Sequence, residues 1–145
     1  MAAPAARPPV TELREEESLT DEATSASGAS GGRESAVTGV DRRDGAVVLS
    51  LAGELDLYNA EDVRSSFRDA LAGDPAVLVV DLEQVTFVDS TTLGIFVETR
   101  SRFADRSGFR LAAPGLEVRR ALEVSGLGDI FVVDDTVAEA LEAAR

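Results

Sequence analysis

The sequence predicts an α/β domain with a mixed, mostly parallel sheet of about five strands and about four helices packed against it. The prediction rests first on Val77–Leu82, which is apolar except for Asp81 and rich in β-branched residues, as in a central strand covered on both faces. It rests second on the segment after a short connection, where Leu93, Phe96 and Val97 recur at helical spacing. The pattern of apolar residues therefore changes from that of a strand to that of a helix near Asp89-Ser90.

The elements before the central strand follow from composition and turn residues. Ala36–Val40 and Ala46–Leu51 are expected to be strands, with Asp44-Gly45 as a tight hairpin turn between them. Gly53–Leu57 is expected to be a turn that carries two carboxylates. A helix should follow, capped by Asn59 and ended by Gly73-Asp74-Pro75, and its inward residues are Val63, Phe67, Ala70 and Leu71.

The elements after the central strand alternate between helix and strand. We expect the helix at Ser90 to include Phe103 and to end near Arg106–Gly108, before a fourth strand at Phe109–Ala112. Alternation of this kind implies right-handed crossovers and parallel pairing. The remaining predictions are a helix from Pro114-Gly115 to Gly126, a strand at Ile130–Val133, and a last helix capped by Asp134-Asp135.

The 145 residues are enough for one domain and a tail. Residues 1–35 are rich in Ala, Pro, Ser, Gly and Glu and have few large apolar side chains, so we expect a disordered acidic tail and a folded domain over 36–145. No apolar run approaches the roughly 20 residues that span a bilayer, and the N-terminus lacks the apolar core of a secretory signal. We expect a cytoplasmic protein that is a monomer when free.

Composition argues against two classes of partner and excludes most catalytic designs. A net charge of −13 argues against nucleic acid and anionic membranes as partners, because both require basic surface. The chain has no Cys and no His, and all 14 of its basic residues are Arg. Disulfides, Cys/His zinc sites, histidine-based triads and lysine chemistry are therefore excluded. We predict no catalytic residue, no metal and no cofactor, and hence no enzyme.

Ser90 has two possible roles on chemical grounds. A serine at a helix start is a good N-cap, because its oxygen accepts a hydrogen bond from an otherwise unpaired amide. The same place would put a phosphate at the positive end of the helix dipole. The residues alone favour the cap, and they leave Asp56 as an ordinary turn carboxylate and Asp89 as an acid near a helix N-terminus.

Four segments in order resemble a known family, the STAS domain. They are Gly53-Glu54-Leu55-Asp56, the strand ending Asp81-Leu82, Phe87–Gly94, and Val124-Ser125-Gly126-Leu127. More narrowly, they resemble the stand-alone bacterial anti-sigma factor antagonists. The resemblance runs from about Ala36 to Leu141, and the tail has no counterpart in it.

The resemblance implies a small α/β domain with helices largely on one side of a mixed sheet. It also implies a protein that, when unphosphorylated, binds an anti-sigma factor with serine kinase activity and so releases a sigma factor. The family's acceptor serine matches Ser90, with Thr91 as the alternative, and a metal-dependent phosphatase reverses the modification. The family's carboxylates match Asp56 and Asp89.

The segment that follows the acceptor is expected to contact the partner. Where many family members have Gly, this chain has Thr92, which adds bulk where a glycine would let a partner's backbone approach. The expected acceptor neighbours and partner-binding residues are Asp56, Asp89, Thr91, Thr92, Leu93 and Gly94.

Three other functions remain as alternatives. The first, within the family, is a STAS subunit of a membrane transporter or of a larger signalling complex. The second is a two-component receiver domain in which Asp81 ends a central strand, although a receiver also needs a lysine that the chain lacks. The third is a hydrolase with Asp56 and Asp89 as acid and base, for which the sequence supplies no pocket, metal cluster or oxyanion pattern.

Overall fold

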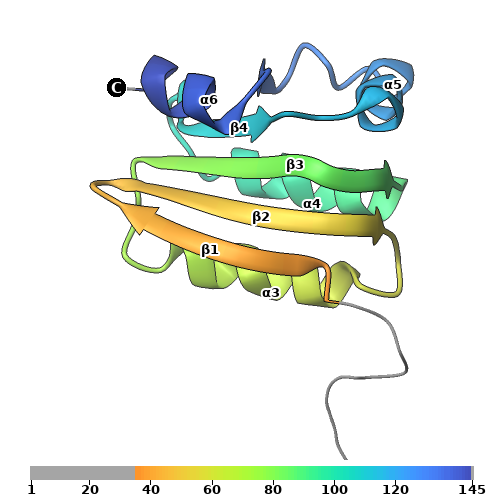
Figure 1. The fold of residues 1–145 in the computed structure, drawn as a ribbon, viewed down its shortest axis with the longest axis horizontal. Helices are drawn as coiled ribbons and strands as arrows, with labels where there is room; N and C mark the ends of the chain where they lie inside the picture. Colours follow the sequence, from red (N-terminus) through yellow and green to blue (C-terminus); the bar gives the residue numbers. More distant parts are fainter. Residues whose placement is uncertain (1–34, 145) are drawn as a thin grey trace, which may run out of the picture. The chain divides into compact units, whose positions relative to one another are not determined.

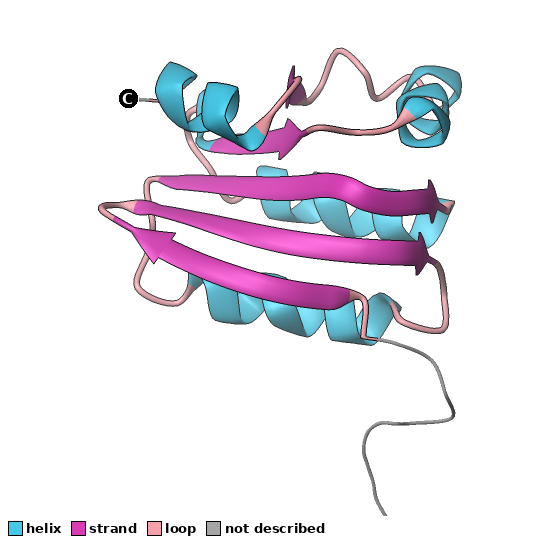
Figure 2. Ribbon diagram, viewed as in Figure 1, coloured by secondary structure: helices cyan, strands magenta, loops and turns pink. Residues whose placement is uncertain are grey.

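The computed structural model describes residues 35–144. The chain divides into two units, Met1–Ser35 and Ala36–Arg145, and the predicted disordered tail lies outside the described residues except for Ser35. The elements of the second unit are drawn in Figures 1 and 2. They are β1 (Val37–Arg43), β2 (Ala46–Leu55), α3 (Ala60–Leu71), β3 (Val77–Val88), α4 (Ser90–Arg100), a 3-10 turn (Arg106–Gly108), β4 (Phe109–Ala112), α5 (Leu116–Val124), β5 (Val132–Asp134) and α6 (Val137–Ala143).

The five strands form one sheet in the order β1-β2-β3-β4-β5. The β1–β2 pair is antiparallel and the other three pairs are parallel, so the predicted mixed, mostly parallel sheet is confirmed. The predicted hairpin turn at Asp44-Gly45 joins the antiparallel pair. Gly45 has φ +71°, in the left-handed region that glycine enters without strain.

The helices lie on both faces of the sheet, with three on one face and one on the other. The larger core joins α3, α4 and α5 to inward side chains such as Leu49, Leu78 and Val80. Its five phenylalanine rings lie with centroids 5.8 to 6.5 Å apart. On the opposite face, Ala140 of α6 packs against Val79 and its neighbours. Figure 1 shows α3 and α4 behind the sheet and α6 in front of it.

Three strands are longer than predicted, and the first of them, β1, runs to Arg43 and not only to Val40. The expected turn at Gly53–Leu57 is wrong, because β2 continues to Leu55, and the expected connection after Leu82 is wrong, because β3 runs unbroken to Val88. The cause is the β2–β3 pairing, whose register shifts twice, between Ser50 and Ala52 and between Gly53 and Glu54. Such irregularities interrupt the inward–outward alternation, and Gly53, with φ +81°, accommodates one of them.

In two helices the N-cap is a different residue from the one predicted. The N-cap of α4 is Asp89 and not Ser90, because the Asp89 carboxylate accepts a hydrogen bond from the Thr92 N–H at 3.0 Å. Thr136, not Asp134-Asp135, caps α6, and it accepts from the Glu139 N–H at 3.0 Å. In each case the cap is the residue with extended backbone directly before the first helical turn.

Two further boundaries were misplaced. Helix α4 ends at Arg100, and Phe103 packs on the core from beyond the helix. Asp105 then accepts hydrogen bonds from the Ser107 N–H and hydroxyl, which lower the pKa of its carboxyl and favour a turn over more helix. Strand β5 starts at Val132, because Ile130 donates its N–H to the Leu127 carbonyl in a turn.

Candidate functional site

The candidate site lies at the edge of the sheet where β2 and β3 end. Leu55 pairs with Val88 at the last position of both strands, and the Asp89 N–H donates to the Leu55 carbonyl at 3.0 Å. Both arrowheads point to this edge in Figure 1, where α3 and α4 begin. The structure therefore brings Asp56, which follows β2, beside Asp89-Ser90, which follow β3, as expected of parallel neighbours.

Ser90 is exposed and is the first residue of α4. Because Asp89 caps the helix, the Ser90 hydroxyl is not used as a cap, and it has no hydrogen-bond partner within residues 35–144. The amide groups of the first turn give this end of the helix a partial positive charge. The hydroxyl is thus accessible to a second protein at a place where the helix amides favour a phosphate and the carboxylates of Asp56 and Asp89 oppose it.

The residues after Ser90 divide between surface and core. Gly94 is exposed one turn beyond Ser90, and a Cβ added there would meet nothing within 4 Å. Thr91 is half-buried. Thr92 is 0% exposed and Leu93 6% exposed, and the Thr92 hydroxyl is buried without a hydrogen-bond partner among the described residues. Any effect of Thr92 or Leu93 on a partner must therefore act through the position of α4.

The loop between β2 and α3 contributes Asp56 and two exposed apolar side chains. Asp56 is half-buried, and its carboxylate accepts a hydrogen bond from the Tyr58 N–H at 3.0 Å. Leu57 and Tyr58 are 69% and 84% exposed. They were not among the residues predicted from the sequence, although two large side chains at the end of an expected turn, directly before a helix, are unusual and give a signal for a contact surface.

A further apolar side chain lies near the same edge. Phe87, the residue before the last of β3, pairs with Glu54 of β2 and is 47% exposed. Exposed apolar residues scattered singly are ordinary, but three of them at the edge that carries an exposed serine are typical of a protein-binding surface. We call Leu57, Tyr58 and Phe87 the apolar rim of the site.

The receiver-domain alternative loses support at this geometry. Asp81 does not end β3 but lies within it, seven residues before Val88, so the basis for a receiver domain is wrong. Within residues 35–144 no group of three or more acidic side chains is placed to hold a metal. No helix in the same range has the length and apolar composition to cross a bilayer.

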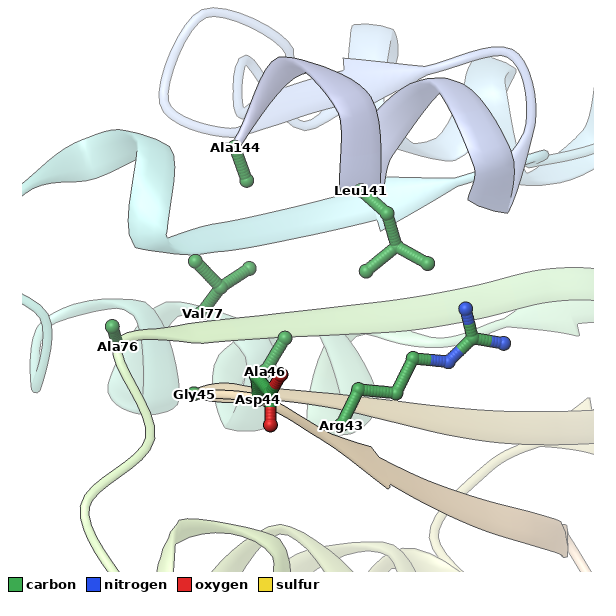
Figure 3. A pocket seen from close by; sticks show the side chains of 8 residues that line it. All are labelled: Arg43, Asp44, Gly45, Ala46, Ala76, Val77, Leu141 and Ala144. Atoms are coloured by element: carbon green, nitrogen blue, oxygen red, sulfur yellow. The ribbon is translucent and has the colours of Figure 1, made fainter.

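A pocket lies at the opposite end of the sheet. It is shown in Figure 3 between the β1–β2 turn and α6, and its lining residues include Arg43, Gly45, Val77 and Leu141. Arg43 is paired with Asp41 there at 2.9 Å. None of the predicted site residues lines it, so this pocket provides no substrate cavity for a hydrolase built on Asp56 and Asp89.

Comparison with known proteins points to one family. The sequence profile of the STAS domain matches residues 39–140. The anti-sigma-F factor antagonist RsfB of Mycobacterium tuberculosis is 32% identical over 102 residues, which span 70% of this chain and 84% of that protein. An anti-sigma factor antagonist from Mycobacterium paratuberculosis, known from a crystal structure, has a TM-score of 0.70 at 32% identity, over 78% of this chain and 97% of that one.

A second solved relative is known in two states. The anti-sigma factor antagonist SpoIIAA in its unphosphorylated form is 26% identical, with a TM-score of 0.64, over 76% of this chain and 96% of that one. SpoIIAA of Bacillus in the phosphorylated form has a TM-score of 0.58 at the same 26% identity, over 76% of this chain and 100% of that one.

Proposed function

The chain belongs to the STAS domain family, and from that premise we propose that it is an anti-sigma factor antagonist switched at Ser90. In the unphosphorylated form it binds an anti-sigma factor of the serine kinase type, and the sigma factor is released. The kinase phosphorylates Ser90, which ends the binding, and a metal-dependent phosphatase restores it. The names of the similar proteins support the general role, and SpoIIAA, solved with and without phosphorylation, supports the switch.

One observation carries the proposal most directly: the Ser90 hydroxyl is exposed, does not cap α4, and lies at the same sheet edge as the apolar rim. A phosphate there adds roughly −1.5 to −2 charges at neutral pH. The amides of α4 offset that charge within the domain, so the fold is retained. A partner surface pressed against Ser90 would instead bury an unpaired charge, and the complex would dissociate.

The remaining parts of the proposal concern the protein as a whole. Residues 36–145 form the STAS domain, residues 1–35 form an acidic tail, and the free protein is a cytoplasmic monomer. In this proposal the protein receives the phosphoryl group at Ser90 and is not itself an enzyme, which the regulatory role named for its relatives supports.

Capture from the native cell tests the function. Ser90→Ala, used as bait, is expected to retain an anti-sigma factor constitutively, and Ser90→Asp is expected to bind it at least about tenfold more weakly. Incubation of the captured kinase with ATP and wild-type protein, followed by mass measurement, should place the phosphate on residue 90. Thr91→Ala is the matched control and should be modified normally.

Two outcomes would contradict the proposal. Equal affinity of Ser90→Ala, Ser90→Asp and the wild type for the anti-sigma factor would rule out the switch. Capture of a transporter or of a larger signalling complex, with no anti-sigma factor among the retained proteins, would favour the alternative within the family.

A further inference from the structure

The side chain of Asn59 holds the loop between β2 and α3 through two hydrogen bonds. Its Oδ1 accepts from the Asp56 N–H at 2.9 Å, and its Nδ2 donates to the Glu54 carbonyl at 2.8 Å. The loop is closed further by the Tyr58 N–H on the Asp56 carboxylate and by the Asn59 N–H on the Asp56 carbonyl, at 3.0 and 3.3 Å. One amide side chain therefore fixes the backbone on both sides of Leu55.

Asn59 does not do what its position predicts. It is the N-cap residue of α3, and asparagine is among the strongest capping residues, but its side chain makes no capping hydrogen bond to the helix. Its backbone, at φ −113° and ψ 11°, is not extended, whereas the caps of α4 and α6 are extended and bond the third helical amide. In α3 the polar atoms that would cap the helix are directed to the preceding loop instead.

The segment that Asn59 holds is the most exposed part of the apolar rim. Leu57 and Tyr58 follow Asp56 directly, and both project into solvent. A loop bearing two such side chains loses conformational freedom when a partner covers it, and that loss weakens binding. A loop already fixed by Asn59 loses less.

We propose that Asn59 is a positioning residue that pre-organises the Asp56–Tyr58 loop as a rigid docking element, in place of capping α3. The pre-organisation of the loop is argued from the two side-chain hydrogen bonds of Asn59 and does not depend on the proposed function. The partner that uses it rests on the proposed function, and would be the anti-sigma factor.

Tyr58 itself provides the measurement, because it is the only tyrosine of a chain without tryptophan. Its fluorescence anisotropy therefore reports on this loop in the full-length protein. Asn59→Ala removes both side-chain hydrogen bonds and should lower the anisotropy of Tyr58 clearly. Asn59→Asp keeps an acceptor for the Asp56 N–H but has no donor for the Glu54 carbonyl, so it should give an intermediate value.

Two variants separate positioning from stability. The Asn59→Ser side chain is too short to reach both loop partners, but it can cap α3 once the freed backbone becomes extended. This variant should therefore unfold at or above the temperature of Asn59→Ala and still show a mobile Tyr58. Thr136→Ala removes the cap of α6 and should lower the unfolding temperature while leaving Tyr58 unchanged. Wild-type anisotropy in folded Asn59→Ala and Asn59→Ser would overturn the proposal.

A binding measurement then tests the docking role. In the Ser90→Ala background, Asn59→Ser should weaken affinity for the captured anti-sigma factor by roughly tenfold, because the partner must order the loop. If the background binds no anti-sigma factor, the proposed function fails while the anisotropy result stands. If the variant that also carries Asn59→Ser has a mobile Tyr58 and yet binds with unchanged affinity, the docking role of Asn59 is wrong and the proposed function stands.

Discussion

At the scale of single residues, Thr92 is the clearest conflict between local chemistry and burial. Its hydroxyl is buried and has no hydrogen-bond partner in the described part of the chain. A buried, unsatisfied hydroxyl costs about 1–3 kcal/mol. Thr92→Val keeps the shape and removes that cost, so we expect it to raise the free energy of unfolding by about 1 kcal/mol, measured by urea denaturation.

Thr99 is the matched control for this prediction. It is also buried on α4, but its hydroxyl donates to the Ile95 carbonyl at 2.8 Å, so Thr99→Val should bring no gain. Equal effects of the two substitutions would contradict the assignment of an unpaired hydroxyl. Because Thr92 does not reach the surface, Thr92→Val should also leave affinity for the anti-sigma factor unchanged. Measuring that affinity shows whether Thr92 affects partner choice.

The step from Asp89 to Ser90 shows what sequence can and cannot predict at this scale. Asp and Ser are both strong N-cap residues, so the sequence predicts that a helix starts here but does not say which of the two caps it. The backbone decides: Asp89 is extended, with φ −104° and ψ −178°, while Ser90 is already helical. That one-residue difference is what leaves the hydroxyl of Ser90 available to a partner.

At the scale of elements, a buried ion pair holds β5 to β4. The Arg110 guanidinium donates two hydrogen bonds to the Asp134 carboxylate, at 2.8 and 3.0 Å, and a third to the Ser107 carbonyl at 3.2 Å. The side chains of the pair are 7% and 12% exposed. Asp134→Ala leaves a buried guanidinium unpaired, and we expect a loss of about 3–5 kcal/mol in the free energy of unfolding.

The neighbouring pair of Arg119 and Asp135 is the control. It is joined at 3.1 Å, but its side chains are 45% and 78% exposed, so Asp135→Ala should cost less than about 1 kcal/mol. Thermal and urea unfolding of the two variants would measure the difference. Similar losses in both would show that burial does not decide the strength of the Arg110–Asp134 pair.

The lengths of β2 and β3 could not be predicted because they depend on their mutual pairing. Glu83 and Gln84 are consecutive exposed residues, as are Thr86 and Phe87, so each pair interrupts the local strand alternation. The interruptions coincide with the shifts of register against β2. By contrast, β4 was predicted at its observed bounds, since four consecutive buried residues between turns are recognisable locally.

At the scale of the whole molecule, the order of the elements was predictable but the composition of the site was only partly so. The family resemblance implied that Asp56 lies beside Ser90, and the parallel pairing of β2 and β3 explains why, because the ends of neighbouring parallel strands meet at one edge of the sheet. The apolar rim was missed, since the exposure of Tyr58 or Phe87 depends on which helices cover which part of the sheet. The role of Asn59 was missed for a related reason: its preference for a helix cap is local, and its loop contacts are not.

The boundary of the folded domain gives the last prediction. Ala36 is 2% exposed, and its carbonyl accepts a hydrogen bond from the Ala52 N–H at 2.8 Å, so the packed structure extends to this residue. Removal of residues 1–34 leaves this contact in place and is the matched control. Removal of residues 1–37 also deletes this contact and the start of β1, and should lower the unfolding temperature by roughly 4–8 °C for each kcal/mol lost. Calorimetry on the two truncated chains makes the comparison, and an equal loss in both would move the domain boundary into residues 1–34.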